Sequence, residues 1–290
     1  MTQTVRIVLT SPDAIPETLR TLVAEQLTDP RDEVWEEAPW GQVSSIVGEV
    51  AERARTRALV RGAAGRLGID SAIVEGPLAS SPPRLLVMDV DSTFITSEVL
   101  EGEAHGAGSG AQVEAITERA MRGELDFTAA LRERVTTIAG LDVAALDDVR
   151  SQIQFTPGAL DLVALAKQAG TTIALVSGGF AEVVEPLVDG LGIDHVFANH
   201  FEVRDGRLTG LTRGEIVDRA AKRRHLLALA EKVGCSPDET VAIGDGANDL
   251  DMLDAAGLGV AFCAKPVAAT QADATISFPR LDAVSAFLRW

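Results

Sequence analysis

The chain has 290 residues, 46% of them hydrophobic, which is enough to build two domains or one large one around a sizeable core. Its formal net charge of -17 opposes nonspecific binding to nucleic acid or to anionic membranes, because both attract basic surfaces. No apolar run approaches the ~18 residues that span a membrane, and the N-terminus lacks the pattern of a signal peptide. The sequence therefore predicts a cytoplasmic protein without nucleic acid or membrane partners, and a small anionic substrate remains compatible with it.

The first eighty residues alternate between strand and helix patterns, in an order that suits a small α+β sandwich. Strands are predicted at residues 5–9, 43–50 and 69–74, helices at residues 16–27 and 51–67, and a weaker strand near residues 34–36. The βαββαβ-like order resembles ACT-type regulatory domains, which usually carry a glycine in the first strand-to-helix loop, where an amino acid effector binds. Residues 11–16 contain no glycine, so dimerisation or packing stands beside amino acid sensing as a role for residues 1–80.

A stretch rich in proline and serine, residues 76–83, breaks both helix and strand and predicts a linker. Beyond it, strand patterns alternate with helical ones. We predict strands at residues 85–90, 172–176, 195–198, 240–244 and 258–262, and helices at residues 159–169, 181–191 and 218–233. This alternation predicts an α/β domain over residues 84–290, with a Rossmann-like parallel sheet and right-handed crossovers.

The long segment between the first of these strands and Thr156 has helical spacing, with patterns at residues 113–121, 127–138 and 143–153. We therefore expect a helical cap insertion over about residues 97–155. Because the insertion leaves the sheet at the carboxyl end of a strand, it is positioned to cover the ligand crevice as a lid.

Two aspartates one residue apart follow the first strand of the predicted sheet. Asp89 and Asp91 come after the apolar run Leu85-Leu86-Val87-Met88, which is typical of a strand covered on both faces. Residues i and i+2 of an extended chain point to the same side, so both carboxylates can face one cavity. A charged pair in that position is costly unless a cation or a reaction uses it.

Three further segments are predicted to reach the same edge of the sheet. One strand ends in Ser177-Gly178-Gly179, a turn whose backbone N–H groups can approach an anion closely. Lys222 lies on a predicted helix, and Asp245 and Asp249 follow another strand. Taken singly, each has a structural explanation. The glycines can form an ordinary turn, Lys222 can belong to a solvated basic helix face, and Asp245 and Asp249 can be turn or cap residues. Only the combination of all four segments predicts a functional site.

The combination places a hard-cation site beside an anion site. Carboxylates without imidazole or thiolate ligands suit Mg²⁺, which bridges to phosphate, although Mn²⁺ accepts the same oxygen ligands. Ser177, the glycine N–H groups and Lys222 would surround the oxygens of a phosphoryl group. One aspartate of the pair can attack phosphorus while the other transfers protons. No Walker-type phosphate loop is present in the sequence, which disfavours nucleotide binding of that kind.

These four segments resemble the four motifs of the haloacid dehalogenase superfamily and, within it, the phosphoserine phosphatase family. The closer likeness rests on residues 91–98, 118–127, 131–135, 176–180, 244–249 and 261–266. The resemblance extends over about residues 85–290. It implies a Mg²⁺-dependent enzyme that hydrolyses O-phospho-L-serine to L-serine and phosphate, the last step of serine biosynthesis.

The resemblance also implies a role for each matching core residue. Asp89 would be the nucleophile that forms an aspartyl-phosphate, and Asp91 would be the general acid and base. The metal would be held by Asp89, by the backbone carbonyl of Asp91 and by Asp245, with Asp249 in support. The transferring phosphoryl group would be held by Ser177, Gly178, Gly179, Lys222 and Asn248.

Substrate choice would depend on the cap. By the same resemblance, Glu98 would contact the substrate amine and Arg134 its carboxylate, while Met121 and Phe127 would cover the ligand. Phe127 and Arg134 are seven residues apart, so one helix face can present both.

Two other functions remain open. Because cap packing chooses the acceptor, the chain could be a phosphatase or phosphotransferase acting on another small phosphomonoester. It could also be a serine-sensing regulatory protein, in which residues 1–80 bind serine. A homodimer is expected if the N-terminal module pairs as ACT-like modules often do. The two cysteines, Cys235 and Cys263, have no metal or redox spacing and are expected to be buried thiols.

Overall fold

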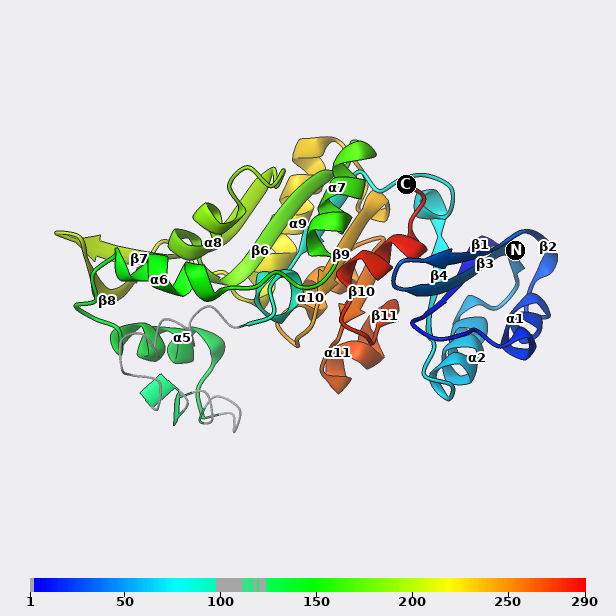
Figure 1. The fold of residues 1–290 in the computed structure, drawn as a ribbon, viewed down its shortest axis with the longest axis horizontal. Coiled ribbons are helices and arrows are strands. Elements are labelled where there is room, and N and C mark those ends of the chain that lie inside the picture. The colour runs from blue at the N-terminus through cyan, green and yellow to red at the C-terminus, as the bar shows by residue number, and fades with distance from the viewer. Residues whose placement is uncertain (1–2, 98–111, 114, 117–118, 120–123) are drawn as a thin grey trace.

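A computed structural model describes residues 3–97, 112–113, 115–116, 119 and 124–290 of the chain, except the side chain of residue 32. The chain forms two β-sheets that lie next to each other (Figure 1). None of the described helices is long and apolar enough to cross a membrane.

The N-terminal sheet has the predicted order of elements. These are β1 (Gln3–Ser11), α1 (Glu17–Ala24), β2 (Thr28–Ala38), β3 (Gly41–Val50), α2 (Arg53–Gly65) and β4 (Asp70–Glu75). The strands pair antiparallel in the order β2-β3-β1-β4. The weak signal near residues 34–36 corresponds to the full edge strand β2, whose charged residues and Pro30 are tolerated because one side of the strand is unpaired.

The two faces of the N-terminal sheet have different partners. Val5, Ile7 and Leu9 point toward α1 and α2 and form a core of their own. Val8 and Val74 point the other way and join the core of the larger sheet. The predicted linker is therefore packed between two units, with a short 3₁₀ helix, η1 (Gly76–Ala79), that buries Leu78.

The larger sheet has the strand order β11-β10-β9-β5-β6-β7-β8. Its strands are β5 (Leu85–Met88), β6 (Thr172–Phe180), β7 (His195–Arg204), β8 (Arg207–Arg213), β9 (Thr240–Gly244), β10 (Leu258–Phe262) and β11 (Ala274–Ile276). Every neighbouring pair is parallel except β7 and β8, so the predicted parallel sheet is confirmed with one antiparallel edge strand added. The prediction missed β8 and β11.

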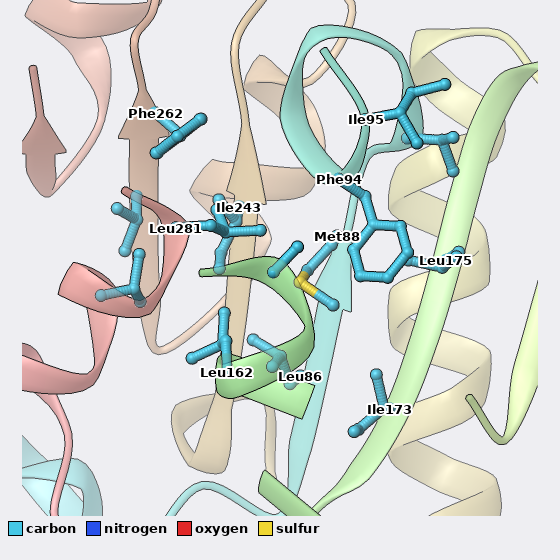
Figure 2. Close-up of a cluster of buried hydrophobic side chains, with 14 of the residues drawn as sticks. Leu86, Met88, Phe94, Ile95, Leu162, Ile173, Leu175, Ile243, Phe262 and Leu281 are labelled. Atoms are coloured by element: carbon cyan, nitrogen blue, oxygen red, sulfur yellow. The ribbon is translucent and has the colours of Figure 1, made fainter. Parts of the chain in front are cut away.

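Helices cover both faces of this sheet (Figure 1). On one face lie α7 (Ala159–Gln168), α8 (Ala181–Val188) and the 3₁₀ helix η4 (Leu281–Phe287). On the other lie α9 (Arg219–Val233) and α10 (Leu250–Ala255), while η3 (Pro237–Glu239) and α11 (Pro266–Gln271) are short connecting helices. Figure 2 shows how alternate strand residues such as Leu86, Met88 and Ile243 meet Leu162 and Leu281 on the first face. This packing holds the carboxyl ends of the central strands in fixed positions.

The cap insertion leaves and re-enters the sheet at the carboxyl end of β5. Thr96 N donates to Gln154 O at 3.0 Å, and Thr156 N donates to Phe94 O at 3.0 Å, so the outgoing and returning chains are paired. Its described helices include α5 (Phe127–Thr136) and α6 (Ala145–Gln152). The prediction of a helical insertion after the first strand is confirmed by these helices.

The prediction that both cysteines are buried is wrong for Cys263. This residue is exposed and has a φ of 42°, in the turn that leads from β10 to α11. Cys235 is partly buried, and both thiols are free.

Candidate functional site

The two predicted aspartates lie at the end of the central strand β5. Asp89 is 2% exposed, and its backbone N–H still bonds to Ile243 O of β9 at 2.9 Å, so the sheet fixes its backbone. Its side chain accepts a hydrogen bond of 2.7 Å from Val90 N. Ser92 has a φ of 56°, which turns the chain out of the strand direction directly after Asp91. The prediction that Asp89 and Asp91 face one cavity is confirmed.

That cavity has a volume of about 70 Å³, room for a few water-sized groups, and joins the sheet edge to the cap. Its described lining residues are Asp89, Asp91, Phe127, Leu131, Arg134, Gly178, Gly179, Asp245, Asn248 and Lys265. Phe127 begins α5 and Arg134 lies in its last turn, so one face of this helix presents both side chains, as the spacing predicts. Glu98 and Met121 lie outside the described residues.

Lys222 is buried between two carboxylates. It lies in the first turn of α9, which begins after the N-cap Asp218, and its side chain is 1% exposed. Its Nζ lies 2.7 Å from Asp89 Oδ1 and 2.6 Å from Asp249 Oδ1. A solvated basic face therefore does not describe Lys222, although it describes the neighbouring arginines, of which Arg219 and Arg224 form exposed ion pairs.

Three carboxylates converge beside the cavity, which two of them, Asp89 and Asp245, line. One oxygen each of Asp89, Asp245 and Asp249 lies within 4.8 Å of the others. The close approach of Asp249 requires Gly244, because a Cβ there would lie 2.4 Å from Asp249 Cγ. Asp249 is fully buried, and its other oxygen accepts a hydrogen bond of 3.0 Å from Gly246 N.

The charge of this cluster favours an added cation. Burial, then the neighbouring Asp249, raise the pKa of Asp89 well above its usual value, despite the opposing effect of Lys222. Burial alone would lower the pKa of Lys222, but Asp249 and Asp89 outweigh it, so the net shift is upward. Both directions have one cause, a buried site with more carboxylates than cations. A divalent ion with oxygen ligands fits this donor set.

The Ser177-Gly178-Gly179 turn predicted from the sequence lies within the last residues of β6, where the pairing with β7 is irregular, and provides hydroxyl and backbone donors beside the aspartates. Ser177 is fully buried; its Oγ accepts a hydrogen bond from Gly179 N at 2.7 Å and donates to Asp91 Oδ2 at 3.2 Å. A Cβ at Gly178 would lie 3.1 Å from Phe127 Cζ, so the absence of a side chain lets the aromatic ring approach the turn.

Sequence reasoning missed Asn199. This residue of β7 is 1% exposed; its Nδ2 donates to Gly178 O at 2.8 Å and its Oδ1 accepts from Val217 N at 2.8 Å. Asn199 thus joins the Ser177 turn to the segment that enters α9 and carries Lys222. Asn199 directly follows the predicted strand 195–198, and a polar residue at that place could have indicated a structural role. Strand periodicity alone does not reveal its two hydrogen-bond partners.

A carboxylate cluster at the carboxyl edge of a mostly parallel sheet, next to a helical insertion, defines the chain as an α/β protein with a candidate cation site at this edge. Comparison with known proteins agrees with this class. The haloacid dehalogenase-like hydrolase family matches residues 86–254, more than half of the chain, and the chain belongs to this family.

Individual relatives extend the likeness. A phosphoserine phosphatase from Streptomyces coelicolor is 49% identical over 240 residues, which are 83% of this chain and 58% of the relative. The chain thus spans less than two thirds of that relative's length. A haloacid dehalogenase family hydrolase from Salmonella enterica serovar Typhi has a TM-score of 0.87 at 28% identity, covering 99% of this chain and 98% of that one. A structure of a phospho-aspartyl intermediate analogue of phosphoserine phosphatase has a TM-score of 0.67 at 37% identity, covering 72% and 100% of the two chains.

Proposed function

We propose that the chain is a Mg²⁺-dependent phosphoserine phosphatase, which converts O-phospho-L-serine and water to L-serine and phosphate, the last step of serine biosynthesis. The observation that carries this proposal is that Asp89, Asp91, the Ser177 turn and Arg134 meet around one cavity, with Lys222 bound to Asp89. The names of the similar enzymes support the same substrate.

The reaction proceeds through two displacements at phosphorus. In the first, a carboxylate oxygen of Asp89 attacks phosphorus while Asp91 protonates the departing serine oxygen, leaving an aspartyl-phosphate. In the second, Asp91 takes a proton from water and the water oxygen attacks the same phosphorus. The bond between phosphorus and the Asp89 oxygen breaks, which releases phosphate and regenerates the Asp89 carboxylate. Ser177, the N–H groups of the glycine turn and Lys222 stabilise the charge on the phosphoryl oxygens.

The metal role falls to the carboxylate cluster. Asp89, Asp245 and the backbone carbonyl of Asp91 would hold Mg²⁺, which supplies positive charge next to the phosphoryl oxygens. Asp249 has a supporting role, since its two oxygens already accept from Lys222 and Gly246.

Arg134 selects the substrate by its carboxylate. Its planar guanidinium can form a paired contact that an ester without a carboxylate cannot use, and Phe127 and Leu131 line the same side of the cavity. The roles of Glu98 at the substrate amine and of Met121 over the ligand remain expectations from the sequence.

The test of this function is a kcat/KM panel over phosphoserine, phosphothreonine, phosphoethanolamine, sugar phosphates and nucleotides. Phosphoserine is expected to be preferred, and Arg134→Ala should reduce kcat/KM for phosphoserine by roughly 10- to 100-fold. Phosphoethanolamine, which lacks the carboxylate, is the control and should change little with the same substitution. A flat panel, or preference for another ester or for an alcohol acceptor, would contradict the proposed substrate.

The remaining parts of the proposal concern organisation. We propose an ACT-like module over residues 1–80 and a catalytic domain over residues 84–290, with the cap at about residues 97–155; the two separate sheets support this division. The exposed free thiol of Cys263 supports a reducing cytoplasmic location.

The unpaired edge of β2 supports a homodimer, which light scattering on the purified protein tests.

Removing divalent metal is expected to abolish phosphate release. Adding Mg²⁺ should restore it, because the ion supplies the positive charge that the carboxylate cluster lacks. Mg²⁺ should also raise the melting temperature, because binding to the folded state adds stability that grows with the logarithm of the Mg²⁺ concentration and reaches about 2.7 kcal/mol at 100 times its Kd. Asp245→Ala should weaken both responses. Phosphate release that persists unchanged in EDTA would refute the metal role.

Asn199→Ala is expected to lower kcat by roughly 10- to 100-fold with a smaller change in KM, because the Ser177 turn and the start of α9 lose their shared tether. The buried partners left unpaired should also cost about 1–3 kcal/mol of unfolding free energy. Asn199→Asp keeps the acceptor for Val217 N but loses the donor to Gly178 O. This variant should therefore not recover the kcat that Asn199→Ala loses. If both variants had the same kcat and KM as the unsubstituted protein, a positioning role for Asn199 would be ruled out.

A further inference from the structure

A second cavity, of about 600 Å³, lies at the seam between the N-terminal sheet and the last residues of the chain. Figure 1 shows the C-terminal end beside this sheet. The cavity is lined by Gln3, Thr4, Arg31, Val47, Gly76, Ala79, Ser80 and Arg289. Its size falls in the range of small-molecule sites, and its lining contains two arginines and no aspartate or glutamate, in a chain of net charge -17.

A buried arginine, Arg6, lies two residues along β1 from the lining residue Thr4, although it does not itself line the cavity. Arg6 is 2% exposed and lies on the same face of β1 as Thr4, directly opposite Val47 of β3. Its guanidinium donates to Ala286 O at 3.2 Å and to Phe287 O at 2.5 Å, while its Nε is buried without a hydrogen-bond partner. Within the described part of the chain no carboxylate pairs with it, which is unusual for a buried charge.

The charges around Arg6 increase this imbalance. Burial, and then the nearby Arg289, lower the pKa of Arg6 to about 10. Arg289 itself has no ion pair among the described residues. Arg31 has one exposed partner, Asp29 at 3.0 Å. Two carboxylates lie nearby without lining the cavity: Glu75 is bound by Arg53 at 2.7 Å and by Gln3 at 3.0 Å, and Glu49 of β3 stands directly opposite Thr4.

We propose that this cavity binds a small polyvalent oxyanion of the class of inorganic phosphate, pyrophosphate and phosphorylated metabolites. Arg289 and Arg31 contact the anion from the cavity wall, while Arg6, which does not line the cavity, adds only its positive charge from beneath. The hydroxyls of Thr4 and Ser80 add neutral donors. Because Arg6 also holds the carbonyls of residues 286 and 287, a bound anion strengthens the contact between the N-terminal sheet and η4.

The chain carries its own reporter for this site. All three tryptophans lie outside the catalytic cavity: Trp35 and Trp40 belong to the N-terminal sheet region, and Trp290 follows Arg289. Pyrophosphate and inorganic phosphate are titrated separately into the metal-free 290-residue protein at constant ionic strength, with tryptophan fluorescence and melting temperature as readouts. Neither readout requires turnover, so the result does not depend on the proposed phosphatase activity.

A saturable fluorescence change and a rise in melting temperature are expected, with tighter binding for the anion that better fills the cavity. Arg289→Ala should raise Kd about tenfold or more, and Arg31→Ala should do the same to a smaller extent. The control is Arg204→Ala, which removes an exposed arginine of β7 at the far end of the larger sheet (Figure 1) and should leave Kd unchanged. No saturable response at millimolar anion, or the same Kd in Arg289→Ala, would overturn the proposal.

Discussion

Asp89→Asn is expected to lower the kcat for phosphate release from phosphoserine by at least about 10³-fold. The amide has the shape of the carboxylate but is not a nucleophile toward phosphorus, and it is a poorer ligand for a divalent cation. Asp89 is the first residue after β5, is 2% exposed and lies 2.7 Å from Lys222 Nζ, so its carboxylate is held at the end of the central strand. Phosphate release at saturating substrate and Mg²⁺ measures the effect.

The loss should not come from unfolding. Without metal, Asp89, Asp245 and Asp249 crowd one buried lysine, so removing one negative charge is not expected to lower the melting temperature. The matched control is Asp251→Asn, an exposed aspartate of α10 that pairs with Arg219, which should leave kcat unchanged. Near-normal turnover by Asp89→Asn would show that the nucleophile is another group.

The central strands and their acidic ends could be predicted because their signals are local. A strand buried on both faces reads as an apolar run, and the carboxyl ends of parallel strands share one edge, so Asp89, Asp91 and Asp245 could be placed together without a structure. The cap helix α5 could be predicted for the same reason, since the seven-residue spacing of Phe127 and Arg134 is a property of one helix.

Lys222 could not be assigned in this way. Arg219, Arg223 and Arg224 stand beside it on the same helix, and nothing local distinguishes the buried cation from the exposed ones. Its burial depends on Asp89 and Asp249, which other strands supply. Lys222 was selected from the four basic residues by its place in the order of the four segments and by the resemblance to a family, not by any local signal.

The missed strand β8 has a different cause. It pairs with β7 through a turn at Asp205-Gly206, where φ is 51° and 75°, and an Asp-Gly pair of this kind is a strong local hairpin signal. The alternating helices and strands favoured a uniformly parallel sheet and outweighed that signal. The hairpin matters for the site because β8 packs against α5, the helix that carries Arg134.

Lys222→Met is expected to lower the free energy of unfolding by about 3–5 kcal/mol in the absence of metal. Methionine fills a similar volume, but it leaves the carboxylates of Asp89 and Asp249 buried without the ammonium group that lies 2.7 Å and 2.6 Å from them. The same substitution should lower kcat by at least about 10²-fold, because a charged donor to the phosphoryl oxygens is lost. Urea unfolding in EDTA measures the first effect, and phosphate release with Mg²⁺ measures the second.

Two comparisons separate electrostatics from packing at this position. Arg224→Met removes a cation from the same helix, but its ion pair with Glu215 is exposed, so stability should change by no more than about 0.5 kcal/mol. Mg²⁺ should recover part of the stability of Lys222→Met, since a cation among Asp89, Asp245 and Asp249 replaces the missing charge, while kcat stays low. If Lys222→Met were no less stable than Arg224→Met in EDTA, the buried carboxylates would not depend on Lys222 for their charge. The lysine's contribution would then be limited to the phosphoryl group.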